Sequence, residues 1–227
     1  VNSFKEMSLK LFKLYKLNSN SVVADIGCND GSLLKEFKSL GISKTVGIDP
    51  TNTIKYAPKY IKTIQDFMNL KCSKKALNFY GKIDLITTTN VFAHTNKLKD
   101  FILGVKKLIK KDGVFVIENH YLGAIIKKKQ FDSFYHEHLR TYSLKSLINL
   151  LKYYGFKIID AYTTDRYGGN IQAHFTLGNR KKSNKIKKIL IHEKKEKLDK
   201  EITYKKLNDE IGDIDLKISK FLDKNKN

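Results

Sequence analysis

The sequence has few cysteines and no long apolar run. Cys28 and Cys72 are its only cysteines, which is too few for a disulfide framework or a four-cysteine zinc site. No run of about 18 apolar residues occurs, and the N-terminus lacks the charged-then-apolar pattern of a signal peptide. We therefore expect neither a membrane span nor secretion. We expect a cytoplasmic protein with both thiols reduced.

Arginine is also scarce, although the chain is strongly basic. Lysine and arginine together number 44 and the net charge is +21, yet arginine occurs only at positions 140, 166 and 180. A surface that reads phosphates is expected to use more of arginine's bidentate guanidinium groups. We therefore do not expect a nucleic-acid partner. A nucleotide-linked small substrate would also benefit from the positive potential.

The composition divides the chain into a core and an extension. The 227 residues, of which 41% are hydrophobic, suffice for one buried core with an appendage. From about residue 181 onward, charged and amide residues surround spaced isoleucine and leucine. We predict a core over residues 1–180 and a lysine-rich helical extension over residues 181–227, as one long amphipathic helix or a helix pair. The sequence opens with Val1 and stops inside a helical run, and it leaves open whether the chain is a fragment of something longer.

Short strands and helices alternate along the core. Helices are predicted over residues 3–17, 32–41, 98–113, 121–130 and 143–155, and strands over 21–26, 44–50, 60–67, 82–90, 113–119, 156–165 and 170–178. This alternation predicts an α/β fold with a mostly parallel sheet that is covered on both faces. The last two strands are joined by the short segment RYGG, which predicts an antiparallel pair at one edge of the sheet.

The segment DIGCNDG, residues 25–31, forms a glycine-bearing turn between the first predicted strand and the helix after it. Glycine lets a ligand approach the backbone closely, because it has no Cβ and accepts unusual dihedral angles. Gly27 and Gly31 are spaced G-x-x-x-G. Asp25 would repel a pyrophosphate, but it suits a ligand that carries an amino group and a sulfonium. The predicted ligand is S-adenosylmethionine (SAM), with Asn29 of the same turn as a further contact.

Further cofactor contacts are predicted where the next strands end. Asp49 could accept hydrogen bonds from both ribose hydroxyls, as an acid does at the equivalent strand end of dinucleotide-binding folds. Asp66 could hold the adenine amino group while Phe67 packs on the ring, and Asn90 ends the strand over 82–90. Each residue could instead end a turn or cap a helix. Together, and in this order, they predict the class I SAM-dependent methyltransferase fold, which is Rossmann-like.

Four segments carry a family resemblance that spans about residues 3–180: VVADIGCNDGSLLKEF, NVFAHTNKLKDF, FDSFYHEHLRTYSL and YGGNIQAHF. They resemble the SAM-dependent C-methyltransferases that act on nucleotide-linked keto-deoxysugars. The resemblance implies a seven-stranded sheet whose last strand is antiparallel, and methylation of a sugar carbon next to a ketone. Members of that family usually carry a cysteine-rich zinc domain before this core and an α/β domain after it. Neither has a counterpart in the 227 residues.

The segment YHEH, residues 135–138, concentrates groups that can move protons. A carbon beside a carbonyl becomes nucleophilic after it loses a proton, so the site needs a base and donors for the developing enolate. His138 is the predicted base, because a neutral imidazole accepts a proton near neutral pH. Glu137 would support that imidazole, and Tyr135 and His94 would donate hydrogen bonds to the oxygen. The resemblance implies the same four active-site positions.

These side chains converge only if the segment is irregular. In a regular strand Tyr135 and Glu137 would face away from His136 and His138, so we predict an irregular loop between two helices. His136 is left out of the site as a residue that pins the loop. A metal site built on the two histidines lacks a third ligand at suitable spacing, and we predict no metal.

Three other functions fit parts of the sequence. A small-molecule O-methyltransferase would also use a histidine base. An RNA or protein methyltransferase is less favoured, because TTTNVFAH lacks the aromatic-ended Asn/Asp-Pro-Pro stretch of amino-methylating enzymes and no Pro-Cys pair offers a nucleophile for pyrimidines. The third is a non-catalytic fragment that binds SAM. The sequence leaves open the sugar, the methylated carbon and the oligomeric state.

Overall fold

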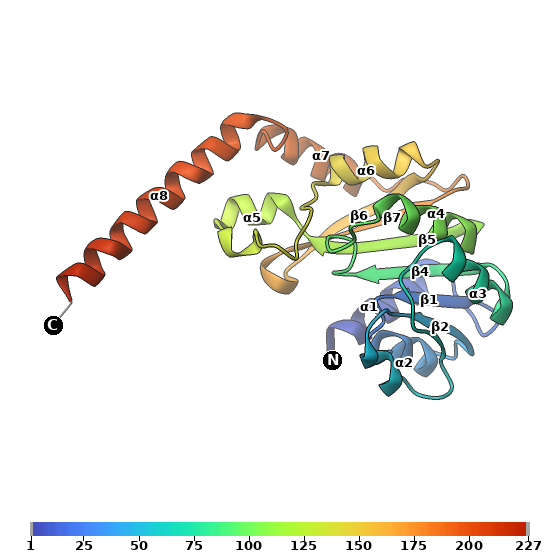
Figure 1. Cartoon of the computed structure of the whole chain (residues 1–227). Coiled ribbons are helices and arrows are strands. Elements are labelled where there is room, and N and C mark those ends of the chain that lie inside the picture. The colour runs from blue at the N-terminus through green and yellow to red at the C-terminus, as the bar shows by residue number, and fades with distance from the viewer. Residues whose placement is uncertain (1, 226–227) are drawn as a thin grey trace.

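A seven-stranded mixed sheet with helices on both faces forms the body of the computed structural model, which describes residues 2–225 (Figure 1). The strands are β1 (Val22–Ile26), β2 (Lys44–Ile48), β3 (Lys62–Ile64), β4 (Ile83–Thr89), β5 (Ile109–His120), β6 (Lys157–Thr164) and β7 (Asn170–Thr176). The helices are α1 (Asn2–Leu14), α2 (Ser32–Ser39), α3 (Leu70–Tyr80), α4 (Leu98–Leu108), α5 (Leu122–Lys128), α6 (Leu144–Tyr153), α7 (Lys185–Lys195) and α8 (Glu201–Lys224). Short 3₁₀ turns lie at Asn52–Tyr56, Phe131–Ser133 and Arg166–Gly168.

The strand order is β3-β2-β1-β4-β5-β7-β6. Strands β1 to β5 pair in parallel, whereas β7 runs antiparallel between β5 and β6. The order confirms the predicted class I methyltransferase sheet and the predicted antiparallel pair, with β6 at the edge. The chain reverses its direction of travel across the sheet between β1 and β4. Ligands of open α/β sheets bind beyond the carboxyl ends of the strands at such a switch point.

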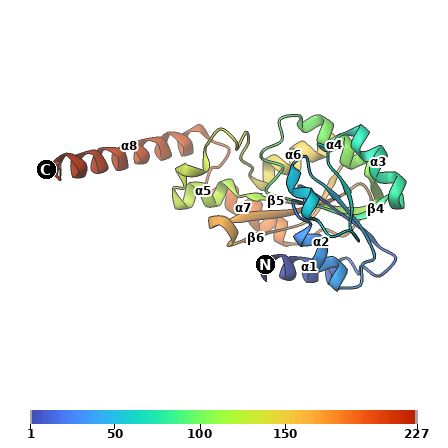
Figure 2. The ribbon, with the colours of Figure 1, turned by 60° about the horizontal axis from the view of Figure 1, so that its bottom comes forward.

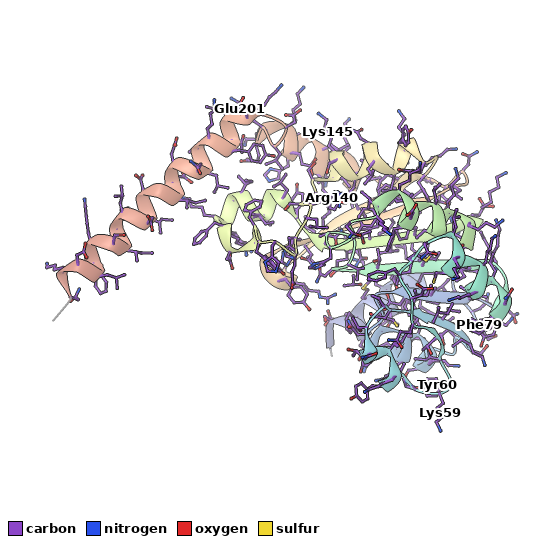
Figure 3. The ribbon with its side chains drawn as sticks, in the orientation of Figure 1. Lys59, Tyr60, Phe79, Arg140, Lys145 and Glu201 are labelled. Carbon is purple, nitrogen blue, oxygen red and sulfur yellow. The ribbon has the colours of Figure 1, made fainter. Side chains whose placement is uncertain are left out.

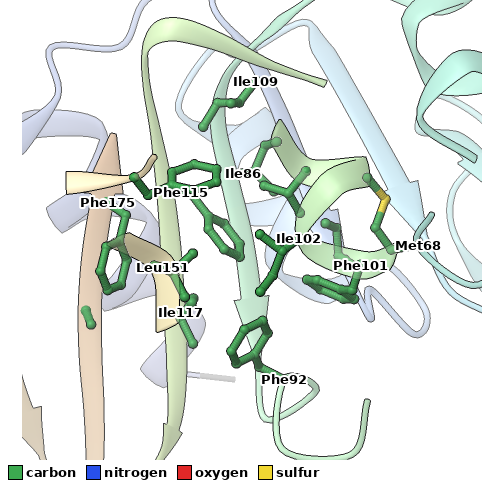
Figure 4. Packing of buried hydrophobic residues seen from close by; sticks show 14 of the residues in the cluster. Met68, Ile86, Phe92, Phe101, Ile102, Ile109, Phe115, Ile117, Leu151 and Phe175 are labelled. Atoms are coloured by element: carbon green, nitrogen blue, oxygen red, sulfur yellow. The ribbon is translucent and has the colours of Figure 1, made fainter. Parts of the chain in front are cut away.

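Apolar side chains fill a layer on each face of the sheet. Helices α1 and α2 cover one face, with Leu11 and Phe37 fully buried against it. Helices α3, α4 and α6 cover the other face, where Phe92 lies edge-on to Phe101 of α4 at 5.5 Å between ring centroids (Figure 4). Because its side chains are buried on both faces, β1 is apolar except for Asp25, as expected of a central parallel strand.

Two elements differ from the prediction. The helix α3 was not predicted, although Asn69 and Gly81 bracket it and the Asn69 side chain accepts the Cys72 N–H at 2.9 Å as an N-cap. The helix predicted over residues 98–113 ends at Leu108. From Ile109 onward the chain joins β5, where Ile109 pairs with Ile83 of β4, so sheet pairing overrides the local helical pattern.

The predicted C-terminal helix pair consists of α7 and α8. Helix α7 packs on the core, with Ile186 and Glu193 buried, whereas α8 extends away from the sheet in both views (Figures 1 and 2). The turn between the two helices lies beside the start of α6, where Lys145 pairs with Asp199 at 2.8 Å (Figure 3). Within residues 2–225, no helix has the length and apolar character needed to cross a bilayer.

Candidate active site

A cavity of about 270 Å³ lies at the switch point of the sheet. Its walls come from the β1–α2 turn, the end of β4, the turn between β6 and β7, and Phe4 of α1. Four predicted cofactor contacts line it, namely Asp25, Gly27, Asn29 and Asn90. Segments that are far apart in the sequence therefore meet around one space.

The two glycines of the turn stand where neighbouring side chains leave no room for a Cβ. Gly27 has φ +80°, and a Cβ there would lie 2.1 Å from Cγ2 of Val91. Gly31 has φ +76°, and a Cβ there would lie 2.9 Å from the Ile61 side chain. Side chains rarely adopt such positive φ angles, so both the conformation and the close packing require glycine.

Asp25 is a buried carboxylic acid beside this turn. The Thr87 hydroxyl donates a hydrogen bond of 2.7 Å to its Oδ1. Burial raises the pKa of Asp25 to about 7, and the charge of Asp49 adds to the rise, while the Thr87 bond opposes it. A cationic ligand placed against Asp25 would favour its ionised form, which is the charge complement expected for an ammonium or sulfonium group.

Asp49 fixes the β1–α2 turn through hydrogen bonds to backbone groups. Its Oδ2 accepts the Asn29 N–H at 3.0 Å, and its Oδ1 accepts the Thr51 N–H at 2.8 Å and the Thr51 hydroxyl at 2.5 Å. A carboxylate has about four acceptor sites, so three donors leave it further capacity. The structure therefore shows Asp49 fixing the backbone of Asn29. Its contact with ribose stays a prediction.

Asp66 and Phe67 are not brought to the other predicted contacts. Asp66 forms an ion pair of 3.0 Å with Lys75 of α3, and the Phe67 side chain is 72% exposed. Neither lines the cavity. Their contact with adenine stays a prediction.

Asn90 is tied to a buried polar cluster that the sequence analysis missed. Asn90 has φ +54°, and its N–H donates to the carbonyl of Glu118 at 2.8 Å. The buried Glu118 carboxylate accepts the side-chain amides of Asn170 at 3.2 Å and Gln172 at 2.6 Å, and it lies 2.9 Å from the Arg166 guanidinium. The position of Glu118 just before the end of a predicted strand was the signal available in the sequence.

The YHEH segment lies in an irregular loop, as predicted. Residues 134–141 lie outside any helix or strand, between the turn Phe131–Ser133 and the start of α6. Arg140 (Figure 3) ties the loop to the segment between β4 and α4 by donating to the Thr95 carbonyl at 2.6 Å. The buried Glu193 carboxylate of α7 accepts the N–H groups of Leu144 and Lys145, which fixes the point where the loop enters α6.

Three of the four predicted catalytic residues converge. The Nδ1–H of His138 donates to the Ser133 carbonyl at 2.9 Å, which leaves Nε2 as the acceptor in the neutral ring. The Tyr135 hydroxyl lies 3.3 Å from that Nε2. The His94 ring lies 4.8 Å from the His138 ring, and its Nδ1–H donates to the Glu137 carbonyl at 2.9 Å.

Glu137 has a different arrangement from the one predicted. Its carboxylate lies 4.0 Å from Nε2 of His136, and both side chains are exposed. The loop makes a tight turn in which the His138 N–H donates to the Tyr135 carbonyl at 2.9 Å, and the ring of His138 is directed to Ser133. The contact that orients His138 is therefore the Ser133 carbonyl, and the Glu137 carboxylate does not provide it.

His120, at the end of β5, is a third imidazole in this cluster and was missed from the sequence. Its ring lies 5.1 Å from that of His138 and 6.0 Å from that of Tyr167, and its buried Nδ1 has no partner within residues 2–225. Burial lowers the pKa of His120, as do the positive charges that His138 and His94 can carry, while Asp132 opposes the shift. In the described part of the chain, no group of three or more His, Cys, Asp or Glu side chains is arranged to hold a metal ion.

Among curated proteins, two relatives differ in the atom that their names say they methylate. The chain is 30% identical to the C-methyltransferase NovU of Streptomyces niveus over 157 residues, which are 68% of this chain and 37% of that protein. It is 31% identical to the ubiquinone biosynthesis O-methyltransferase of Pelagibacter ubique over 122 residues, which are 52% of this chain and 50% of that protein. The chain thus spans half or less of the length of each of these relatives.

The fold is shared with solved methyltransferases. Magnesium protoporphyrin IX methyltransferase from Synechocystis, solved with bound S-adenosylhomocysteine, superposes with a TM-score of 0.58 at 16% identity, over 77% of this chain and 81% of that one. A family model described as a methyltransferase domain matches residues 4–161, which is more than half of the chain. The chain therefore belongs to this methyltransferase domain family.

Proposed function

We propose that this protein is a SAM-dependent C-methyltransferase that methylates a sugar carbon beside a ketone in a nucleotide-linked deoxysugar. The methyltransferase activity follows from the family, and the sugar and the carbon acceptor are the proposed part. The single observation that carries the proposal is the orientation of His138, whose Nδ1–H is held by the Ser133 carbonyl so that Nε2 is the acceptor, beside the Tyr135 hydroxyl. The similarity to NovU, whose name states C-methylation, supports it.

The cavity beyond β1 and β4 holds SAM in this proposal. Gly27 and Asn29 of the turn line it, and Asp25 faces the space with a carboxyl group that a cationic ligand would ionise. When bound, SAM supplies an electrophilic methyl group. The chain's own residues must then generate a nucleophile and keep its charge stabilised.

His138 supplies the base. Its Nε2 removes the proton from the carbon next to the ketone, and the Nδ1–H bond to Ser133 supports the imidazolium that forms. The Ser133 carbonyl therefore orients the ring. The enolate carbon then accepts the methyl group.

Tyr135 and His94 stabilise the enolate oxygen. The Tyr135 hydroxyl lies next to the base at 3.3 Å, so a ketone that places its α-carbon at Nε2 brings its oxygen within reach of the hydroxyl. His94 is anchored through Nδ1 to the Glu137 carbonyl, so its Nε2 is the ring atom that remains to face a substrate. In the neutral ring Nδ1 carries the hydrogen, so His94 can donate from Nε2 only when the imidazole is protonated.

The test is exchange of the sugar's α-proton with deuterated water, without SAM, using a nucleoside-diphosphate 4-keto-deoxysugar as the probe. The parent protein should exchange the proton, and His138→Ala should slow both exchange and methyl transfer by about 10² to 10⁴-fold, the usual range for a general base. SAM binding should persist in the variant, which controls for folding. Full exchange by His138→Ala with intact SAM binding would remove His138 from this role.

A small-molecule O-methyltransferase is the second candidate, because one of the two curated relatives carries that activity in its name. A histidine base serves O-methylation equally well, since it takes a proton from a hydroxyl group. The exchange experiment separates the two functions, because O-methylation needs no carbon acid. Methyl transfer without His138-dependent carbon exchange would favour the O-methyltransferase.

A further inference from the structure

Arg166 lies at the cofactor cavity but takes no part in the proton transfer proposed above. It belongs to the turn between β6 and β7 and is the one cation among the described residues that line this cavity. It also borders a second cavity of about 470 Å³ beneath α1, which is lined by Glu118 and Gln172. Arg166 therefore lines both spaces, with its side chain largely buried between them.

The guanidinium is held in place from several directions. Its Nη1 lies 2.9 Å from the buried Glu118 carboxylate, and its central carbon lies 5.1 Å from the ring centroid of Phe4 and 5.5 Å from that of Tyr167. Nη1 makes no hydrogen bond within the described residues, because the contact with Glu118 has ion-pair distance without hydrogen-bond geometry. An arginine has five N–H donors, so this one is preorganised with donors to spare.

The charges around the cavity are unevenly distributed. Asp25 and Asp30 stand on the β1–α2 side, and Arg166 stands on the β6–β7 side. The methionine part of SAM carries two cationic centres, the ammonium and the sulfonium, and one anionic centre, the carboxylate. The acids suit the cations, whereas a carboxylate brought into a cavity with these acids needs a cationic donor to be favourable.

We infer that Arg166 binds the carboxylate of the methionine part of SAM. The inference rests on the proposed function, in which this cavity is the SAM site. Planar, bidentate pairing with carboxylates is the geometry for which a guanidinium is best suited. Glu118, Asn170 and Gln172 act as positioning residues, because they hold Arg166 and each other without lining the cofactor cavity.

The probe that tests this inference is decarboxylated SAM, which keeps the adenosyl group, the sulfonium and the amine. Calorimetry should show the parent binding SAM about 10- to 100-fold more tightly than decarboxylated SAM, because one or two charge-assisted hydrogen bonds are lost. Arg166→Gln should lose this preference. It should bind the decarboxylated compound at least as well as SAM, since the acids of the cavity favour the more cationic ligand.

The matched control is Arg180→Gln, which removes the same charge elsewhere. Arg180 donates to the Asp112 carbonyl at 3.0 and 2.7 Å and does not line the cofactor cavity. This variant should keep the parent's preference for SAM. If it lost the preference too, the effect would come from net charge and the inference would fail.

Removing Arg166 leaves the buried Glu118 without a cation, so the single variant risks misfolding. The double variant Arg166→Gln/Glu118→Gln avoids this by removing both charges, and its binding of decarboxylated SAM reports an intact cavity. Equal affinity of the parent for the two ligands, or a preference for SAM that survives in the variants, would overturn the inference alone. Failure of the parent to bind either ligand would overturn the proposed function as well.

Discussion

Asp25 at the cofactor cavity and Asp49 behind it are buried, whereas most side chains of the loop that carries YHEH (residues 134–141, the histidine loop) are exposed to solvent. Asp25 and Asp49 are 4% and 3% exposed, while the side chains of His136 and Glu137 are 90% and 61% exposed. The buried acids are tied to backbone N–H groups and hydroxyls of neighbouring elements. The loop is held by a few side-chain contacts to carbonyls, such as those of His138 and Arg140.

This difference indicates a division of work between the two regions. The cofactor cavity is preformed by the sheet and the glycine turn, so its binding properties depend on steric room and buried charge. The histidine loop presents its groups to water, so a substrate must displace that water before the imidazoles act in a dry site. Substitutions in the first region should therefore change SAM affinity, and those in the second should change turnover.

The largest effect on the preformed region should come from Gly27→Ala. Its Cβ would lie 2.1 Å from Cγ2 of Val91, and overpacking of this kind costs about 1–3 kcal/mol of folding free energy, so the free energy of unfolding in urea should fall by that amount and SAM binding should weaken in calorimetry. Gly41→Ala is the matched control, because Gly41 has φ +90° but nothing lies within 4 Å of an added Cβ. Equal losses of SAM affinity in both variants would show that backbone strain, and not steric room, is what matters.

The next effect should be a pH dependence of SAM affinity through Asp25. With a pKa of about 7, its ionised fraction rises from about 1% at pH 5 to about half at pH 7, so SAM affinity should rise by up to about 50-fold over this range. Asp25→Asn should bind SAM with a flat profile. An unchanged profile in the variant would assign the dependence to another group.

The same pKa makes a second, opposite prediction for folding. The folded-state pKa of Asp25 lies above its ordinary value of 3.8, so between these two values the folded protein keeps a proton that the unfolded chain has lost. The free energy of unfolding should therefore fall as the pH rises from about 4 to about 7, and Asp25→Asn should lessen that fall in urea denaturation. A steeper fall in the variant would contradict a buried, protonated Asp25.

A smaller effect is expected in the histidine cluster. NMR titration of the imidazoles should show the pKa of His120 below its ordinary value of 6.5. In His138→Gln it should rise because one positive neighbour is removed, yet it should remain lowered because burial is the larger cause. A His120 pKa that did not respond to His138→Gln would show that the two rings are farther apart in solution.

The smallest effect should come from Glu137→Gln. Exposed ion pairs contribute about 0–1 kcal/mol, so the rate of methyl transfer should fall less than about fivefold, with His136→Ala as the control of similar exposure. A loss near 100-fold would mean that Glu137 turns toward His138 when substrate binds. That outcome would also weaken the distinction between the preformed cofactor cavity and the solvent-exposed histidine loop.

Local patterns predicted the parts of the site that depend on neighbouring residues. The turn DIGCNDG, the acid that follows β2 and the helix opened by Ser143 all lie where the sequence placed them. Strand alternation also predicted the edge pair β6–β7. Such features are fixed by steric and hydrogen-bonding rules that act within a few residues, so they can be predicted from a single sequence.

Contacts between distant segments were decided only by the tertiary structure. His120 meets His138 because β5 ends beside the loop that precedes α6, and no spacing in the sequence encodes that proximity. The turn within the loop likewise directs the His138 ring to the Ser133 carbonyl, whereas the Glu137 carboxylate lies near His136. The sequence by itself determined the fold, the glycine turn and the identity of the candidate catalytic groups. The partner of each group depended on burial and on strand order, because these bring together residues such as Arg166 and Glu118 that lie 48 positions apart (166 − 118).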